Sequence, residues 1–402
     1  MATASPRRLD PCPCGSGRRF KDCHGSLRPG QPDSAAEALE LRAAGRIEEA
    51  VACVEDKLRV APDSAALLNI RGMLRLDAMD LDGAVADFEA AIARAPQLAE
   101  VHNNLGQVAL MRGDYARGWQ EYEWRTRTPG YADYANYPFP MPRWRGEPLS
   151  GRRILVHAEQ GHGDTIQFAR FLAPLAMRGA AVDIFCHQPL ESLMSRIAGV
   201  GTATARLRER PTHDFHAPII DVAAAHLPHA SAPHWSGAYI TPLPERVERF
   251  ARNFAAAARP LVGVAWKGSA RHVNDRNRSL ERASAATLLR PGPTYVNLQL
   301  GEPVLDDAMI DAAADIADWD DTAAVVSLLD HVVSVDTAVA HLAGAMGKPV
   351  TLLVPFTPDW RWGVGGETTP WYPSMRLARQ LRRADWSAPI EAATARLGAL
   401  PG

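Results

Sequence analysis

The chain has 402 residues, with 44 Lys and Arg against 46 Asp and Glu and a formal net charge of −2 at pH 7. This length predicts two or three domains. Its 47% hydrophobic and 22% charged residues exclude a disordered or fibrous chain. No apolar run approaches the roughly 20 residues of a membrane-spanning helix, so we expect no membrane span and a cytoplasmic protein. The near-zero net charge argues against nucleic-acid binding by the whole chain, although residues 1–28 are locally basic.

The first predicted unit, residues 1–30, is a zinc knuckle. Cys12 and Cys14 are one residue apart, and Cys23 and His24 follow a short loop. Thiolates and imidazole are typical ligands of structural zinc, and a segment too short for a core can fold on metal-binding free energy. The segment resembles the SEC-C motif, found at the C-terminus of the SecA translocation ATPase and in many bacterial proteins. The alternative is reduced cysteines in an unstructured tail.

Residues 31–132 are predicted to form helical repeats with a period of 34. At this spacing small residues align with one another, as do bulky ones: Ala50, Ala84 and Gly118; Val54, Phe88 and Tyr122; Pro62 and Pro96. These spacings are typical of tetratricopeptide repeats, in which small residues let paired helices approach closely. Two or three repeats are expected. Their concave surface would bind a protein or peptide, or the repeats would only space the next domain.

Residues 133–150, rich in Pro, Tyr and Trp, are predicted to be an extended linker. After it, apolar runs alternate with helical segments, which indicates parallel sheets covered by helices. We predict two such units, residues 151–245 and 246–402, with a cleft between them. The expected strands are Ile154–His157, Ala181–Cys186, Ile219–Val222, Leu261–Trp266, Tyr295–Leu298, Val332–Val335 and Val350–Val354, and a helix is expected over 165–178.

The first candidate site follows the strand that ends at His157. A turn with Gly161, Gly163 and Asp164 opens a helix there, and ligands bind at such strand ends in α/β folds. Position 166 is Ile rather than the third glycine of a dinucleotide fingerprint, which disfavours NAD. The competing interpretation is a helix cap, with Asp164 at the N-cap and Gln167 three residues later.

The second candidate site follows the strand that ends at Val335. Asp336 ends that strand, Thr337 begins a helix, and His341 lies one turn later. A helix start presents N–H groups and a positive dipole end to a pyrophosphate. Lys267, just past another strand, would add a cation where phosphates arrive. In the alternative, Asp336 is a cap and His341 packs in the core.

Together these residues resemble the heptosyltransferase-like glycosyltransferases of family 9, which have two Rossmann-like halves in the GT-B arrangement. The resemblance implies that Asp164 is the candidate base. It also implies that Gly161, Gly163, Lys267, Asp336, Thr337 and His341 line the donor site. Tetratricopeptide repeats joined to such a unit resemble bacterial protein glycosyltransferases, including flagellin-modifying ones, and more distantly O-linked N-acetylglucosamine transferases.

The sequence therefore predicts a multidomain α and α/β protein with a zinc knuckle, repeats and a GT-B-like double Rossmann fold. Its expected function is inverting sugar transfer from a nucleotide-sugar donor to a protein hydroxyl, with structural zinc and no catalytic metal. An Asp-x-Asp at 318–320 is expected in a solvated loop. The alternatives are a noncatalytic adaptor that retains sugar or nucleotide binding, and a factor whose knuckle contacts the ribosome or the translocation machinery.

Overall fold

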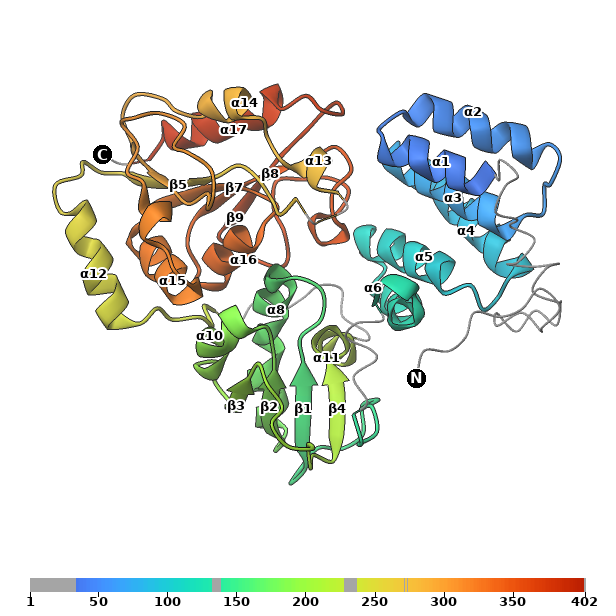
Figure 1. The fold of residues 1–402 in the computed structure, drawn as a ribbon, viewed down its shortest axis with the longest axis horizontal. Helices are drawn as coiled ribbons and strands as arrows, with labels where there is room; N and C mark the ends of the chain where they lie inside the picture. The colour runs from blue at the N-terminus through green and yellow to red at the C-terminus, as the bar shows by residue number, and fades with distance from the viewer. Residues whose placement is uncertain (1–33, 132–138, 228–236, 271, 273, 401–402) are drawn as a thin grey trace. The chain divides into compact units, whose positions relative to one another are not determined.

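The computed structural model describes residues 34–131, 139–227, 237–270, 272 and 274–400, and the chain divides into two compact units at Ala135 and Asn136 (Figure 1). The predicted zinc ligands Cys12, Cys14, Cys23 and His24 lie outside the described residues.

The described part of the first unit contains three helix pairs, in agreement with the predicted repeats. They are α1 (Ser34–Ala43) with α2 (Ile47–Leu58), α3 (Ala65–Asp77) with α4 (Leu81–Arg94), and α5 (Ala99–Met111) with α6 (Tyr115–Tyr122), followed by the short turns η3 (Glu123–Arg127) and η4 (Pro129–Tyr131).

Small residues allow the paired helices to pack closely. A Cβ added to Gly72 would lie 2.5 Å from the Phe88 ring, and one added to Gly106 would lie 2.5 Å from the backbone nitrogen of Tyr122. Phe88 is fully buried. The 34-residue spacing is thus explained by bulky residues that pack against glycine on the facing helix.

The first half of the second unit is a four-stranded parallel sheet in the order β3-β2-β1-β4. Its strands are β1 (Arg153–His157), β2 (Ala181–Phe185), β3 (Val200–Thr204) and β4 (Phe215–Pro218). Its helices are α8 (His162–Phe168), α9 (Leu172–Met177), α10 (Glu191–Ser195) and α11 (Ile219–His226), with the turns η5 (Ala169–Phe171) and η6 (Gln188–Leu190).

One predicted strand of this half is wrong. Ile219–Val222 lies in helix α11, where the Ile220 amide donates to the buried Glu159 carboxylate at 2.9 Å. A short apolar run is compatible with either a buried strand or a buried helix, because its length does not reveal the period.

The second half is a five-stranded parallel sheet in the order β6-β5-β7-β8-β9. Its strands are β5 (Leu261–Ala265), β6 (Thr294–Asn297), β7 (His331–Val335), β8 (Val350–Val354) and β9 (Met375–Arg379). Every residue of β5, β7 and β8 is buried, as expected for a parallel sheet covered on both faces.

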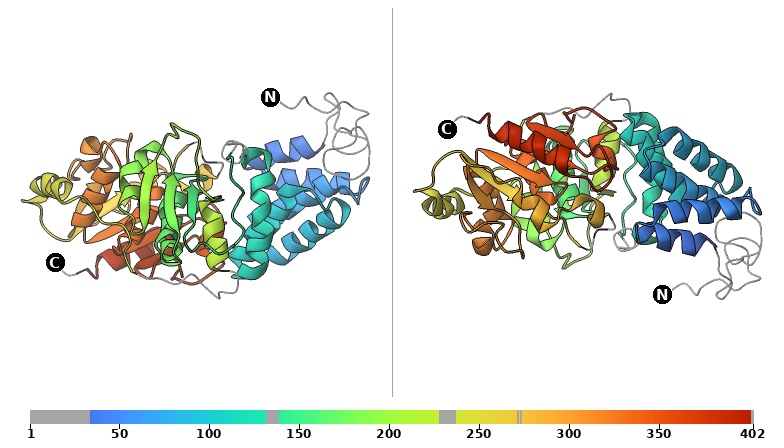
Figure 2. Two further views of the ribbon diagram at one scale, coloured as in Figure 1. Left: turned by 90° about the horizontal axis from the view of Figure 1, so that it is seen from below. Right: turned by 90° about the horizontal axis from the view of Figure 1, so that it is seen from above.

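Helices cover both faces of this second sheet (Figure 1, Figure 2). Helices α14 (Arg282–Ala286) and α17 (Ser387–Leu397) pack on one face, and α15 (Trp319–Leu328) and α16 (Ala338–Ala345) lie on the other. The remaining elements are α12 (Pro244–Phe254), α13 (Asp275–Arg278), η7 (Ala312–Asp315) and η8 (Trp360–Trp362). Two Rossmann-like parallel sheets in one unit form the GT-B arrangement, so the predicted fold class is confirmed for the described residues.

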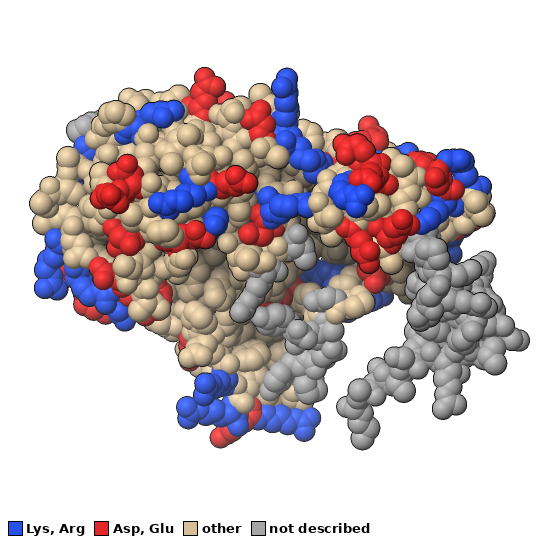
Figure 3. All heavy atoms as spheres, turned by 45° about the horizontal axis from the view of Figure 1, so that its top comes forward, with Lys and Arg blue, Asp and Glu red and all other residues tan. Residues whose placement is uncertain are grey.

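Among the described residues, no helix combines the length and apolar character that crossing a membrane requires. Acidic and basic side chains are interspersed over much of the face shown in Figure 3, in keeping with the net charge of −2.

Candidate functional site

The two candidate segments meet in the second unit because α8 of the first half packs against α16 of the second (Figure 1). Strands β5 and β7 are neighbours, with Ala265 opposite Ser334. Lys267 and Asp336 therefore follow adjacent strand ends, at the carboxyl edge where α/β sheets bind ligands.

The prediction that Asp164 is the N-cap residue of this helix is wrong. Gly161 is the N-cap of α8 and Asp164 is its third residue, whose Oδ2 accepts a hydrogen bond from the Gly161 amide at 2.9 Å. Glycine has no side chain to cap the helix, so the carboxylate reaches back from the first turn instead. Gln167 is not three residues after the cap, and its Oε1 accepts from Arg361.

Arg361, which was not among the predicted site residues, bridges the two halves. Its guanidinium donates to Asp164 Oδ1 and Gln167 Oε1 of α8 and, at 2.8 Å, to Asp359 Oδ1 of its own segment. Its guanidinium carbon, Cζ, lies 4.5 Å from the centre of the Trp360 ring. The side chain is only 6% exposed. Its place in an aromatic run concealed it, because such runs usually fill cores.

Burial raises the pKa of the Asp164 carboxyl above its usual value, and Arg361 and the Gly161 amide oppose that shift. Burial, together with the nearby charge of Asp359, raises the pKa of Asp336 to about 6. Perturbed carboxyls of this kind are common at functional sites.

Gly163 and His341 form a tight contact between the halves. A Cβ at Gly163 would lie 2.8 Å from His341 Cδ2. His341 is buried, its Nδ1 is hydrogen-bonded to the Tyr372 hydroxyl at 3.0 Å, and burial holds its pKa well below the usual value. The imidazole is therefore neutral, and it packs against Gly163 of the other half.

The predicted cation Lys267 is half-buried, and its Nζ pairs with Glu302 Oε1 at 2.6 Å. A second cation, Arg278, was not predicted; its Nη1 donates to the backbone carbonyl of Asp336 at 2.8 Å. Thr337, rather than Asp336, is the N-cap of α16, with extended backbone and no side-chain capping bond. Two cations and a helix start therefore surround the end of β7.

The Asp-x-Asp sequence is not a solvated loop. Asp318 caps α15 by accepting from the Asp321 amide at 2.8 Å. Asp321 is fully buried and pairs with Arg246 at 2.8 Å, and Asp320 pairs with Arg196. These carboxylates are used to join α15 to its neighbours.

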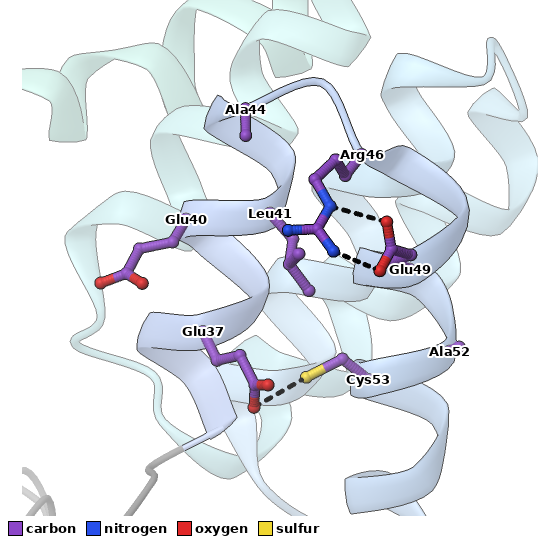
Figure 4. Close-up of a pocket in the computed structure, with 8 residues that line it drawn as sticks. All are labelled: Glu37, Glu40, Leu41, Ala44, Arg46, Glu49, Ala52 and Cys53. Carbon is purple, nitrogen blue, oxygen red and sulfur yellow. Dashed lines mark hydrogen bonds and ion pairs between the residues drawn. The ribbon is translucent and has the colours of Figure 1, made fainter.

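Each unit has a surface hollow among its described residues. One, of about 590 Å³, opens between α1 and α2, where the Arg46–Glu49 pair and Cys53 face it (Figure 4). The other, of about 420 Å³, is lined by residues from Pro140 to Pro142 and from Arg210 to Asp214. Neither includes a residue of the candidate site, where the side chains of Arg361 and His341 are buried.

No group of three or more His, Cys, Asp or Glu side chains among the described residues could hold a metal ion. The candidate zinc ligands lie outside that part of the chain.

Comparisons with known proteins identify the parts of the chain. Residues 10–26 match the SEC-C motif, and residues 35–98 and 71–131 match the tetratricopeptide repeat. The chain thus carries a SEC-C motif and tetratricopeptide repeats before a GT-B-like α/β unit.

Protein FlbA of Caulobacter vibrioides is 30% identical over 362 residues, which cover 80% of this chain and 59% of FlbA. The chain therefore spans about three fifths of that relative.

Two solved structures are similar to part of the chain. A family 9 glycosyl transferase from Veillonella parvula is 13% identical with a TM-score of 0.46, covering 58% of this chain and 87% of that one. The E. coli ADP-heptose lps heptosyltransferase II is 13% identical with a TM-score of 0.43, covering 61% and 100%. Sequence identities of 13% do not show the activity of this chain.

Proposed function

We propose that the α/β unit is a glycosyltransferase that moves a sugar from a nucleotide-sugar donor to an acceptor hydroxyl on a protein, with inversion. The observation that carries the proposal is the convergence of Asp164, from the first half, with the cations and helix start around β7 of the second half. Arg361 contacts Asp164 directly and is close enough to Asp336 to lower its pKa.

The donor diphosphate would bind at the carboxyl edge of β5 and β7. The first N–H groups of α16 lack intrahelical partners, and a helix start favours an anion. Lys267 and Arg278 would add positive charge as the diphosphate departs. In the structure Lys267 is paired with Glu302, so donor phosphates would join or replace that pairing.

Asp164 would act as the general base. It would take the proton of the acceptor hydroxyl while that oxygen bonds to the anomeric carbon and the bond from this carbon to the diphosphate breaks. A single displacement of this kind inverts the anomeric configuration. Burial raises the pKa of Asp164, and a higher pKa makes the carboxylate a stronger proton acceptor.

One observation favours the second candidate, a noncatalytic adaptor that only binds sugar or nucleotide. Both Asp164 oxygens already have partners, Oδ1 with Arg361 and Oδ2 with the Gly161 amide. A carboxylate engaged in this way is a weaker base. The two candidates agree on donor binding and differ on turnover.

The parts outside the α/β unit suit a protein acceptor. Tetratricopeptide repeats commonly present surfaces for protein partners. Cys12, Cys14, Cys23 and His24 would hold one structural zinc within the SEC-C motif, and metal analysis of the purified protein tests this assignment.

A thermal-shift panel of nucleoside diphosphates tests the donor site. The correct diphosphate at about 100 times its Kd should stabilise the protein by about 2.7 kcal/mol. Asp336→Ala should weaken this response, whereas Asp214→Asn, which changes a carboxylate paired with Arg152 outside the site, should preserve it. No shift with any nucleoside diphosphate would contradict the proposal.

A further inference from the structure

Two arginines cross between the α/β halves in opposite directions. Arg361, after β8, reaches into the first half and contacts Asp164 and Gln167. Arg170, in η5 of the first half, donates from Nη1 to the carbonyl of Trp371 at 2.6 Å, and its charged carbon lies 4.7 Å from the centre of the Tyr372 ring. Each is 6% exposed, so the contact between the halves contains two buried charges.

Of these two arginines, Arg361 pairs with a carboxylate of the other half. Arg170 donates to the Gln167 carbonyl at 2.9 Å, to the Trp371 carbonyl and to the Tyr239 hydroxyl, and it lies against aromatic rings. Arg361 instead neutralises Asp164 of the other half and Asp359 of its own. A planar guanidinium can serve several acceptors at fixed angles, which an ammonium cannot do.

We propose that Arg361 is a positioning residue that fixes the carboxylate of Asp164 against the donor half. It holds Oδ1 while the Gly161 amide holds Oδ2, so the orientation of the carboxylate depends on one residue from each half. The proposal deepens the proposed function, because Asp164 is the base in that reaction, but its test needs neither donor nor acceptor.

The charges that face Asp164 come from three segments. Arg361 and Asp359 follow β8, Glu159 belongs to the β1–α8 loop, and His272 follows β5. Of these groups, Arg361 does most to lower the pKa of Asp164, against the effect of burial. Without Arg361, the ionised carboxylate would be buried with Asp359 and Glu159 close by, a costly arrangement.

A cycle of substitutions in the full chain tests this role by thermal unfolding. In the natural chain Asp164→Asn should change the Tm little, because the lost pairing with Arg361 and the removal of a buried negative charge oppose each other. In an Arg361→Met background the same substitution should raise the Tm, because it removes an unpaired buried charge. This more favourable effect of Asp164→Asn in the Arg361→Met background is the expected result, and Asn still accepts the Gly161 amide in both backgrounds.

Arg170→Met is the matched control, because it removes an equally buried arginine that donates to the Gln167 and Trp371 carbonyls and to the Tyr239 hydroxyl. There Asp164→Asn should change the Tm by as much as in the natural chain. If Arg361→Met does not fold, Arg361→Lys keeps the positive charge without the planar guanidinium, and Asp164→Asn should then affect the Tm more favourably than in the natural chain.

Titration gives a second readout. A carboxyl whose pKa is raised by folding costs stability as pH rises from the unfolded pKa, about 3.9 for Asp, toward the folded one, so the Tm of Arg361→Met should fall more steeply with pH above about 4 than that of the natural chain. Asp164→Asn in that background should remove the extra slope.

An equal change of the Tm by Asp164→Asn in the natural and Arg361→Met (or Arg361→Lys) backgrounds would overturn the positioning role. It would leave the proposed sugar transfer intact. Conversely, if no nucleotide-sugar donor is found, the Tm values of these variants still test the positioning role of Arg361.

Discussion

Asp336 shows the structural cost of burying a single carboxyl. Its side chain is 13% exposed, and it lies 3.8 Å from His341 Nε2. Because burial also keeps that imidazole neutral, it supplies no compensating charge. Arg278 and Arg361 are the cations that offset the cost. The buried Asp336 carboxylate would therefore be stabilised by a proton or by a further cation close to it.

The raised pKa of Asp336 predicts the pH dependence of stability. An unfolded Asp loses its proton near pH 3.9, whereas the folded one, with a pKa of about 6, still holds it. Stability from this group is therefore present below about pH 4 and lost as pH rises to about 6. Asp336→Asn should match the natural chain at the acid end and be more stable at neutral pH, by at most about 3 kcal/mol.

Urea unfolding at several pH values measures this difference. A gap that stays constant between about pH 4 and 7 would show that Asp336 does not titrate as stated.

At the scale of elements, the contact of α8 with α16 decides how the halves meet. Gly163 allows it, because its Cα faces both His341 and the backbone of Ala338. In an isolated helix alanine would be favoured over glycine by roughly 0.5–1 kcal/mol. Because His341 and Ala338 lie so close to Gly163, glycine is favoured over alanine at this position.

Gly163→Ala should therefore destabilise the protein by about 1–3 kcal/mol, the usual cost of overpacking. A Cβ would lie 2.8 Å from His341 Cδ2 and 3.4 Å from Ala338 Cα. Gly365→Ala is the control, because a Cβ there would have no neighbour within 4 Å. Equal unfolding free energies for the two variants would contradict the packing described here.

Continuous apolar runs in the sequence predicted the three central strands of the second sheet. Strands β5, β7 and β8 are continuous apolar runs, and all three were predicted. Strand β3 reads Val-Gly-Thr-Ala-Thr at a partly exposed sheet edge, so it has no such run and was missed.

The residues of the candidate site also differ in whether a local sequence pattern reveals them. Lys267 and Asp336 were found because they follow strands, whereas Arg361 was not, because its partner Asp164 is 197 residues away. No local pattern encodes a pairing over that distance.

At the scale of the whole molecule, the repeats and the α/β unit have separate cores. The repeat core includes Val54, Phe88 and Leu105, and the core of the second sheet includes Val264, Val333 and Leu353. A chain built in this way can divide acceptor selection from chemistry.

Deletion of residues 31–128 should therefore abolish modification of a protein acceptor while slow hydrolysis of the donor by water persists. Circular dichroism and the nucleoside diphosphate shift would show that the α/β unit is still folded. Undiminished modification of the protein acceptor by the truncated, folded chain would mean that the repeats only act as a spacer.

The most direct test of the central claim is the release of nucleoside diphosphate from a panel of nucleotide sugars by the natural chain and by Asp164→Asn. The account predicts release by the natural chain and a fall in kcat of roughly 10²- to 10⁴-fold in the variant. The nucleoside diphosphate thermal shift should be retained. Equal rates from a folded Asp164→Asn protein, or no release from any donor that binds, would contradict the claim that Asp164 is the base of a sugar transfer.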